Sequence, residues 1–379
     1  MRKSFIALFL VAALLLTGLL PAFAGDAETI KIGGLAPLTG PVAQYGLSVQ
    51  EGVDLYIQKL NEAGGIDGTP VEMIWLDEKG DPTEAVNAYN RLVEQENVVA
   101  IIGDVTTGPT LAVAELAAEI GLPMITASAT AFEVTEGKPN MFRTCFLDPF
   151  QAGVMANFAN EELSAKKVAV IYDNGDDYSL GLAEAFKAQA EVNGQEVVAY
   201  EAASAADVDF KSQLTTIAAA APDALYVAFY YTEAALIVSQ ASEVGLEVKF
   251  LGGDGIGSIK DSISDVSLLN NTFFYSDHFA ADADTETVVN FIADFNAAYG
   301  KDPSLSFSAT GYDAALVLTE AIKNAGTTES GPVVEALKAT NVEGVTGNLT
   351  FDDHNDPIKS AFVMTFVDGK QVFQKLQTP

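Results

Sequence analysis

Short apolar runs alternate with amphipathic segments of helical length along most of the chain. In the first part the runs are IKIGGLAPL, which begins at Ile30, then VEMIWLDE, VVAIIGDV and PMITAS. The segments between them, near 48–61, 83–96 and 110–120, carry a helical spacing of apolar residues. Apolar strands separated by amphipathic helices are typical of βαβ units. The pattern therefore predicts an α/β fold with a parallel sheet flanked by helices.

The same pattern restarts after FRTCFLDPF, which ends at Phe150. Its strand-like runs are KVAVIYDN, EVVAYEA, DALYVAFY and VKFLGGD, with helices expected near 180–192, 210–220 and 233–244. A chain of 379 residues is also longer than one hydrophobic core usually organises. We therefore predict two α/β lobes of similar plan.

The last part of the chain has too few strands for a third domain. After NTFFYSD come helices near 287–299, 310–325 and 333–339, then the strands of NLTFDD and AFVMTFVDGKQVFQ, with Asp368-Gly369 as a hairpin turn. We expect these elements to complete the first two lobes. The resulting division is 25–145 with 278–353 for the N-terminal lobe, and 146–277 with 354–379 for the C-terminal lobe. Several crossings of this kind form a multi-strand hinge beside a cleft.

The N-terminus has the pattern of a secretory signal peptide, residues 1–24. Arg2 and Lys3 precede an apolar run, and Ala22-Phe23-Ala24 is a small-x-small cleavage site. A membrane anchor is the alternative, but the run is short for a span and Pro21 follows it. Because the cleavage site has no neighbouring Cys, we expect a soluble periplasmic protein without a lipid anchor.

Composition narrows the function further. The net charge of −32 repels nucleic acid and anionic lipid. Cys145 is the only cysteine, so no internal disulfide can form, and a buried core position suits it better than catalysis. The chain lacks a P-loop, the dinucleotide and nucleophile-elbow motifs, and any Cys or His cluster with metal spacing. We therefore expect neither an enzyme nor a bound cofactor or metal.

Candidate ligand contacts follow the strands, because ligands of open parallel sheets bind beyond the carboxyl ends of the strands. Thr106 and Thr107 follow VVAIIGDV, and Ser128-Ala129-Thr130 follows PMITA; a helix is expected to start after each of these loops. Hydroxyls and free amides at the start of a helix suit a carboxylate. Plain helix caps without a ligand are the alternative interpretation of each loop.

The second part of the chain offers a different set at the same kind of position. Tyr178, Tyr230 and Asp254 each follow a predicted strand. A carboxylate facing the hydroxyl loops suits an ammonium group, although Asp254 taken alone fits a turn residue better than a ligand partner. Together the two sets suit a zwitterion such as an α-amino acid.

Several longer motifs carry a family resemblance. They are LAPLTGPVAQYG, NEAGGIDG, DEKGDPTEAV, MITASATAFEVT, FRTCFLDPFQAG, FLGGDG and GYDAALVL. In this order and spacing the chain resembles the periplasmic leucine/isoleucine/valine-binding proteins, the branched-chain amino-acid receptors of ABC importers. The resemblance runs from about Ile30 to the C-terminal hairpin and implies the type I two-lobed periplasmic-binding fold.

The resemblance also implies roles for residues. Thr107 and Thr130 match positions that hold the ligand carboxylate, and the Ser128 carbonyl matches an acceptor for the ammonium. Asp254 stands where the family usually has Glu. The residues that match aromatic positions around the ligand side chain are Tyr45, Tyr178, Tyr230 and Phe307.

Three positions depart from the family pattern. Some members join the loops at Gly80 and Thr106 by a disulfide, which this chain cannot form. Phe132 replaces a frequent Pro, and Asp254 is one methylene shorter than Glu. The last difference leaves the preference for a branched side chain open.

The function expected from the sequence is therefore extracytoplasmic capture of an amino acid. We expect a branched-chain or other apolar L-amino acid, a monomer, and delivery to an ABC permease in the inner membrane. A binding protein of this fold for an amide, urea or an aromatic acid is one alternative. A sensory ligand-binding module is another.

Overall fold

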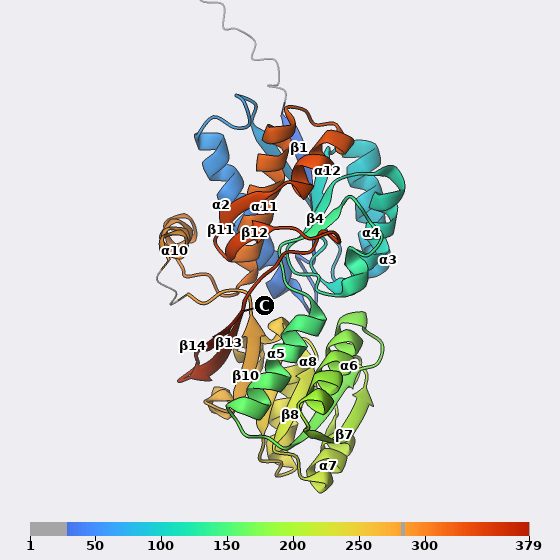
Figure 1. The fold of residues 1–379 in the computed structure, drawn as a ribbon, viewed down its shortest axis with the longest axis vertical. Coiled ribbons are helices and arrows are strands. Elements are labelled where there is room, and N and C mark those ends of the chain that lie inside the picture. Colours follow the sequence, from blue (N-terminus) through green and yellow to red (C-terminus); the bar gives the residue numbers. More distant parts are fainter. Residues whose placement is uncertain (1–28, 282–284, 379) are drawn as a thin grey trace, which may run out of the picture.

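The computed structural model describes residues 29–281 and 285–378, which form two α/β lobes stacked end to end (Figure 1). The expected signal peptide lies outside the described residues. No helix in the described part of the chain is both long and apolar enough to cross a bilayer. The predicted α/β fold, with parallel sheets flanked by helices, is confirmed.

Lobe 1 is built on a parallel sheet with the strand order β2-β1-β3-β4-β5. Its strands are β1 (Ile30–Ala36), β2 (Val71–Asp77), β3 (Ala100–Ile102), β4 (Met124–Thr126) and β5 (Met141–Arg143). The strands β3 and β4 are completely buried, and all their residues except Thr126 are apolar.

Helices cover both faces of this sheet. They are α2 (Ala43–Glu62), α3 (Pro82–Arg91) with a π turn (Leu92–Glu96), α4 (Thr107–Ile120), α10 (Glu286–Tyr299), α11 (Phe307–Ala325) and α12 (Ser330–Lys338). Helix α11 packs directly on α2 although they are far apart in sequence. Gly52 permits this approach, because a Cβ there would lie 1.9 Å from the carbonyl oxygen of Ser308.

Lobe 2 is built on a sheet with the order β14-β13-β10-β9-β8-β6-β7. Its strands are β6 (Lys167–Asp173), β7 (Glu196–Ala203), β8 (Ala224–Ala228), β9 (Lys249–Gly252), β10 (Phe273–Asp277), β13 (Ala361–Val367) and β14 (Lys370–Gln377). Its helices are α5 (Asp148–Glu161), α6 (Asp177–Val192), α7 (Lys211–Ala220), α8 (Tyr231–Glu243) and α9 (Ile259–Ser262). Strands β6 to β10 pair in parallel, whereas β13 and β14 are antiparallel additions at one edge.

The chain passes between the lobes after β5, after β10 and before β13. A separate hairpin of β11 (Asn341–Gly344) and β12 (Gly347–Thr350) precedes the last crossing. Buried charges join the first and last crossings: Arg143 Nε lies 2.6 Å from an oxygen of Asp356, and Lys359 Nζ donates to the Thr144 carbonyl at 2.8 Å. The first and last crossings are therefore joined to each other in the hinge.

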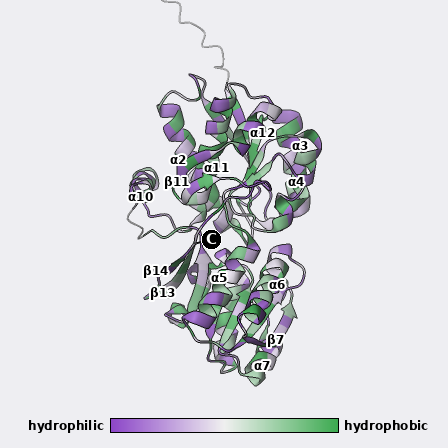
Figure 2. Cartoon of the chain, viewed as in Figure 1, coloured by the Kyte–Doolittle hydropathy of each residue, from purple (hydrophilic) through white to green (hydrophobic). Residues whose placement is uncertain are grey.

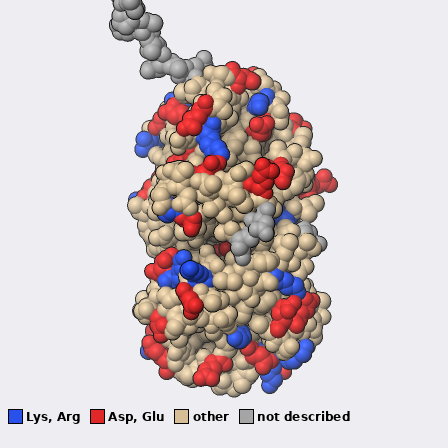
Figure 3. Space-filling view, turned by 90° about the vertical axis from the view of Figure 1, so that its left-hand side faces the viewer, with Lys and Arg blue, Asp and Glu red and all other residues tan. Residues whose placement is uncertain are grey.

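The distribution of side chains matches this plan. Hydrophobic residues concentrate in the strands and inner helix faces of each lobe (Figure 2). Acidic groups, with fewer basic ones among them, are scattered over both lobes, and the face in Figure 3 is hollowed between the lobes. Acidity is thus spread over the surface rather than gathered in one patch of this face.

Two local predictions had different outcomes. Asp368 and Gly369 both have positive φ, of 50° and 74°, between the antiparallel strands β13 and β14, so the predicted hairpin turn is confirmed. The helix start expected after Thr130 is wrong, because only a short 3₁₀ turn, Phe132–Val134, follows it.

Candidate functional site

The carboxyl ends of the parallel strands in both lobes meet at a pocket between the lobes. The residues that line it are Tyr45, Val105, Thr106, Thr107, Ser128, Tyr178, Tyr230, Asp254, Gly255 and Phe307. The centre of a water-sized sphere can occupy about 10 Å³ there, which is room for about one water molecule. In this arrangement the lobes are closed on each other, and an amino acid needs them to separate before it can enter.

The wall from lobe 1 contains the start of helix α4. Thr106 is the residue before the helix, and its side chain makes no capping bond to the described residues of α4. Thr107 is the first helical residue, so its amide lies at the positive end of a helix of 14 residues. Two hydroxyls and this helix end form a neutral, donor-rich surface that suits an anion.

The neighbouring loop supplies Ser128 to the same wall. The Ser128 hydroxyl donates to the Val105 carbonyl at 2.8 Å, and the amides of Ser128 and Ala129 approach the Thr126 hydroxyl oxygen at 3.3 and 3.1 Å. Two residues that the sequence placed in the site, Ala129 and Thr130, do not line the pocket. Both are buried, and the Thr130 hydroxyl faces the carboxyl group of Asp148.

Asp254 provides the acidic group of the lobe 2 wall. It begins a short 3₁₀ turn (Asp254–Ile256) directly after β9 and is 3% exposed. Its Oδ1 accepts hydrogen bonds from the Tyr178 hydroxyl at 2.8 Å and the Gln151 amide at 3.2 Å. Its Oδ2 lies 2.9 Å from Nε2 of His278. These contacts fix the orientation of the carboxylate.

Burial shifts the pKa values of the groups behind Asp254 toward their neutral forms. Burial lowers the pKa of His278, so the imidazole is uncharged and can donate through Nε2. Burial also raises the pKa of Asp148 well above its usual range and that of Asp277 to about 7. A carboxylate that accepts only neutral hydrogen bonds keeps its charge available for a cation. The wall is therefore suited to an ammonium group.

Aromatic rings close the pocket from both lobes. Tyr178 and Tyr230 stack at 5.0 Å between ring centroids, and Tyr45 meets Tyr230 and Phe307 edge-on at 5.7 and 5.2 Å. The Tyr45 hydroxyl, from lobe 1, donates to the Gly255 carbonyl of lobe 2 at 2.5 Å. This apolar lining suits an uncharged ligand side chain.

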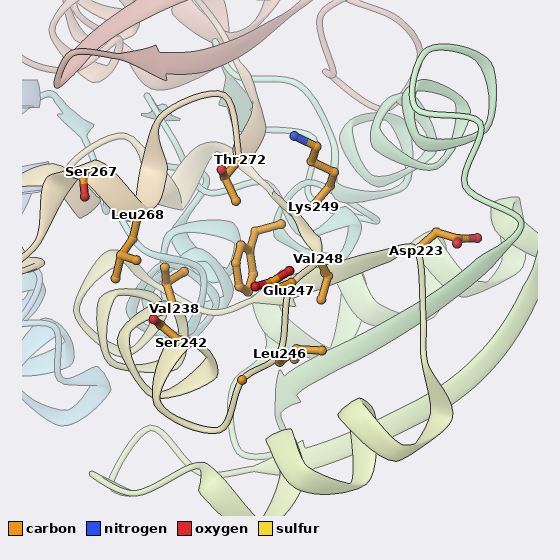
Figure 4. Close-up of a pocket in the computed structure, with 12 residues that line it drawn as sticks. Asp223, Val238, Ser242, Leu246, Glu247, Val248, Lys249, Ser267, Leu268 and Thr272 are labelled. Atoms are coloured by element: carbon orange, nitrogen blue, oxygen red, sulfur yellow. The ribbon is translucent and has the colours of Figure 1, made fainter.

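A wider hollow of about 620 Å³ lies at the opposite end of lobe 2, beside the amino ends of β8 and β9 (Figure 4). Two of its three charged groups, Asp223 and Lys249, already have partners. Asp223 accepts hydrogen bonds from the amides of Lys166 and Lys167, and Lys249 Nζ donates to the Asn271 carbonyl. Since Asp223 and Lys249 are engaged elsewhere, this hollow is a weaker candidate than the pocket between the lobes.

Some residues of the site were missed by reasoning from the sequence. Val105 and Gly255 line the pocket, while Gln151 and His278 orient Asp254 from behind. Gln151 lies within the quoted motif FRTCFLDPFQAG, but nothing local marks it as a partner of a residue about a hundred positions away. Among residues 29–281 and 285–378, no group of three or more His, Cys, Asp or Glu side chains is arranged to hold a metal ion.

Comparison with known proteins agrees with the geometry. Residues 29–371 match the family model described as "Periplasmic binding protein". The chain belongs to this family. It is 34% identical to the Leu/Ile/Val-binding protein homolog 3 of Brucella melitensis over 90% of this chain and 93% of that protein. It is 33% identical to a leucine-, isoleucine-, valine-, threonine- and alanine-binding protein of Pseudomonas aeruginosa, over 92% of each.

Solved structures of this family share the fold. The leucine-binding protein LivK of Thermotoga maritima has a TM-score of 0.87 and 34% identity, over 93% of this chain and 99% of that one. LivJ of Streptococcus pneumoniae, solved with isoleucine, has a TM-score of 0.86 and 33% identity over the same shares. A benzoate complex from R. palustris, at 24% identity and a TM-score of 0.83, shares the fold alone. The type I periplasmic-binding fold implied by the sequence is thus confirmed.

Proposed function

We propose that this periplasmic binding protein captures an apolar L-amino acid, with branched-chain amino acids first among the candidates. The observation that carries the proposal is the pairing of opposite chemistries across one pocket. Asp254 presents a carboxylate from lobe 2, and Thr106 and Thr107 present hydroxyls and a helix start from lobe 1. A zwitterion is the small solute that satisfies both walls.

Each wall takes a separate part of the ligand. The ligand carboxylate accepts hydrogen bonds from the Thr107 amide and the hydroxyls of Thr106 and Thr107. The ammonium group lies against Asp254 and the Ser128 backbone. The aliphatic side chain packs among the aromatic rings of Tyr45, Tyr178, Tyr230 and Phe307. Thr130, which the resemblance gives a carboxylate role, contributes in this arrangement by holding the loop from behind.

The relatives support the choice of ligand. The four at 33–34% identity are all named for leucine or branched-chain amino acids, one of them also for threonine and alanine, and one was solved with isoleucine. The aromatic acids are found in relatives at 24% identity or less, which share only the fold. An aromatic acid has no ammonium group, and it would leave a buried Asp254 carboxylate facing the carboxylate of the ligand. That repulsion favours an amino acid.

The rest of the proposal concerns the export of the chain, its location in the cell and the delivery of its ligand. We infer that the chain is exported through the signal peptide at residues 1–24 and works in the periplasm as a monomer. There it delivers its cargo to an ABC permease of the inner membrane, and it is a carrier rather than an enzyme. The lobes comprise 25–145 with 278–353 and 146–277 with 354–379. Intact-mass analysis of the exported protein tests the cleavage, which predicts a mature chain beginning at Gly25.

A ligand screen tests the central claim. Native mass spectrometry of protein purified from its own host identifies the co-purifying solute, and calorimetry with L-leucine, L-isoleucine, L-valine, urea and benzoate ranks the candidates. We expect the L-amino acids to bind and D-leucine to bind far more weakly, because both charged groups are fixed by the walls. Tight binding of benzoate without leucine binding would reject the proposal. Loss of leucine uptake on gene deletion separates transport from a sensory role.

A further inference from the structure

Two buried carboxyl groups face each other behind the lobe 1 wall. Glu78 follows strand β2 and Asp104 follows strand β3, and both residues are 0% exposed. The two carboxyl groups lie within hydrogen-bonding reach of each other, and each has one buried oxygen without another partner among the described residues. Neither residue lines the pocket, but Asp104 directly precedes the pocket residues Val105 and Thr106.

The outer oxygens of the pair are occupied by backbone amides. Glu78 Oε2 accepts hydrogen bonds from Gly80 and Asp81 at 2.7 and 3.1 Å, and Asp104 Oδ1 accepts from Val105 at 2.5 Å. The remaining oxygens, Oε1 of Glu78 and Oδ2 of Asp104, have no amide or hydroxyl donor in the described part of the chain. Two ionised carboxylates have no hydrogen atom to share, so a hydrogen bond between them requires a proton.

The surroundings supply no positive charge to replace that proton. Asp77, the last residue of β2, adds negative charge beside Glu78, and Lys79 pairs with the exposed Glu84 instead. The first turn of α4, which follows Asp104 in the chain, contains no acidic residue. Within residues 29–281 and 285–378, neither Glu78 nor Asp104 has an ion-pair partner. A proton is therefore the simplest way to stabilise both carboxyl groups.

We propose that Glu78 and Asp104 share one proton and that this hydrogen bond positions the Val105–Thr107 loop for the ligand carboxylate. The Asp104 carbonyl accepts from the Thr126 hydroxyl at 2.6 Å, so the same residue also anchors the loop that carries Ser128. Glu78 and Asp104 are positioning residues in this account. The part that concerns the ligand rests on the proposed function, whereas the shared proton does not.

The pair makes stability depend on pH with a known sign. Burial raises the pKa of Glu78 to about 7, and burial together with the Glu78 charge raises that of Asp104. In the unfolded chain both groups titrate at about pH 4, so above this pH the folded chain holds a proton that the unfolded chain has released. This stabilisation is complete below about pH 4 and is lost as the pH rises to about 7 and beyond. Each such proton raises the unfolding constant about tenfold per pH unit.

The test uses Glu78→Gln, whose amide can donate to Asp104 without a titratable proton. Urea unfolding of the mature protein is measured from about pH 5 to about pH 9, with the exposed Glu94→Gln as a control of equal charge change. We expect the unfolding constant of the wild type to rise with pH. Its rise per pH unit should exceed that of Glu78→Gln by a factor of up to about ten. Glu94→Gln should follow the wild type.

L-Leucine affinity over the same range tests the positioning role. It should decline above neutral pH in the wild type and stay level in Glu78→Gln. Parallel unfolding profiles of wild type and Glu78→Gln would overturn the shared proton. Asp104→Asn places the amide on the other residue of the pair and should also flatten the dependence of the unfolding constant on pH. Failure of both variants to fold at any pH would equally overturn the shared proton. If the wild type binds no leucine at any pH, the proposed function fails while the unfolding profiles still decide on the proton.

Discussion

The imidazole Nε2 of His278 lies 2.9 Å from Oδ2 of Asp254, and the ring is stacked on Phe146 at 3.7 Å between centroids. His278 follows strand β10 and Asp254 follows the neighbouring strand β9, so the pairing of these strands brings the two side chains together. Because burial lowers the pKa of His278, the contact is a hydrogen bond from a neutral ring. The histidine therefore orients the acid without cancelling its charge, which a Lys or Arg at this position would do.

Asp254→Asn should abolish most of the affinity for the ligand. The substitution keeps the size of the side chain but removes the charge that pairs with the ammonium group. Loss of one member of a buried charged pair costs about 2–5 kcal/mol, which lowers affinity by well over tenfold. Calorimetry with L-leucine measures the change, and the exposed Asp261→Asn serves as a control. Unchanged leucine binding by Asp254→Asn would show that Asp254 is only a turn residue.

His278→Gln should change the response to acid. The folded pKa of His278 is lowered, so below about pH 6.5 the unfolded chain binds a proton that the folded chain excludes. The wild type therefore loses up to about 1.4 kcal/mol per pH unit through this residue as the pH falls, and His278→Gln does not. Urea unfolding at about pH 7 and about pH 5 measures the difference between the two proteins. The exposed His354→Gln is the control, and an equal loss in His278→Gln and wild type would contradict the prediction.

The sequence predicted the strands and most helices because their apolar spacing is local. It also predicted the hairpin at Asp368-Gly369, where positive φ at both residues restricts the choice of amino acids. The pocket residues at strand ends could be found for the same reason, since the carboxyl edge of a parallel sheet is where ligands bind. Helix boundaries shifted by a few residues, as at α2, which begins at Ala43 rather than near Ser48.

What the sequence did not reveal depends on partners far along the chain. The loop after Ser128 does not start a helix, because the buried Arg143 guanidinium binds the carbonyls of Ala129 and Ala131 at 3.0 and 2.8 Å. Gln151 and His278 reach Asp254 from elements about a hundred and about two dozen residues away. No local pattern encodes such contacts, so the sequence does not indicate the partners of Arg143 and His278.

Cys145 should be unreactive in the folded protein. The thiol is buried, contacts the Ala129 carbonyl at 3.3 Å, and burial raises its pKa to about 12. Because the thiolate is the reactive species, alkylation by iodoacetamide should proceed in urea and be nearly absent in buffer. Reductant should leave the thermal midpoint unchanged. Rapid native labelling would contradict this burial, and Cys145→Ala controls for reaction elsewhere.

Tyr45→Phe should weaken closure of the lobes without disturbing either lobe. It keeps the ring that packs against Tyr230 and Phe307 but removes the hydroxyl that donates to the Gly255 carbonyl across the cleft. A hydrogen bond of this kind contributes about 0.5–1.5 kcal/mol, so leucine affinity should fall about two- to tenfold. A ligand that bridges both lobes stabilises only the closed state, so small-angle scattering should show the wild type contracting when leucine is added. Tyr45→Phe should need proportionally more leucine for the same contraction. Tyr56→Phe, which loses a hydroxyl contact with Thr319 inside lobe 1, is the matched control. If Tyr45→Phe contracts at the leucine concentration of the wild type, the interlobe hydrogen bond does not contribute to closure.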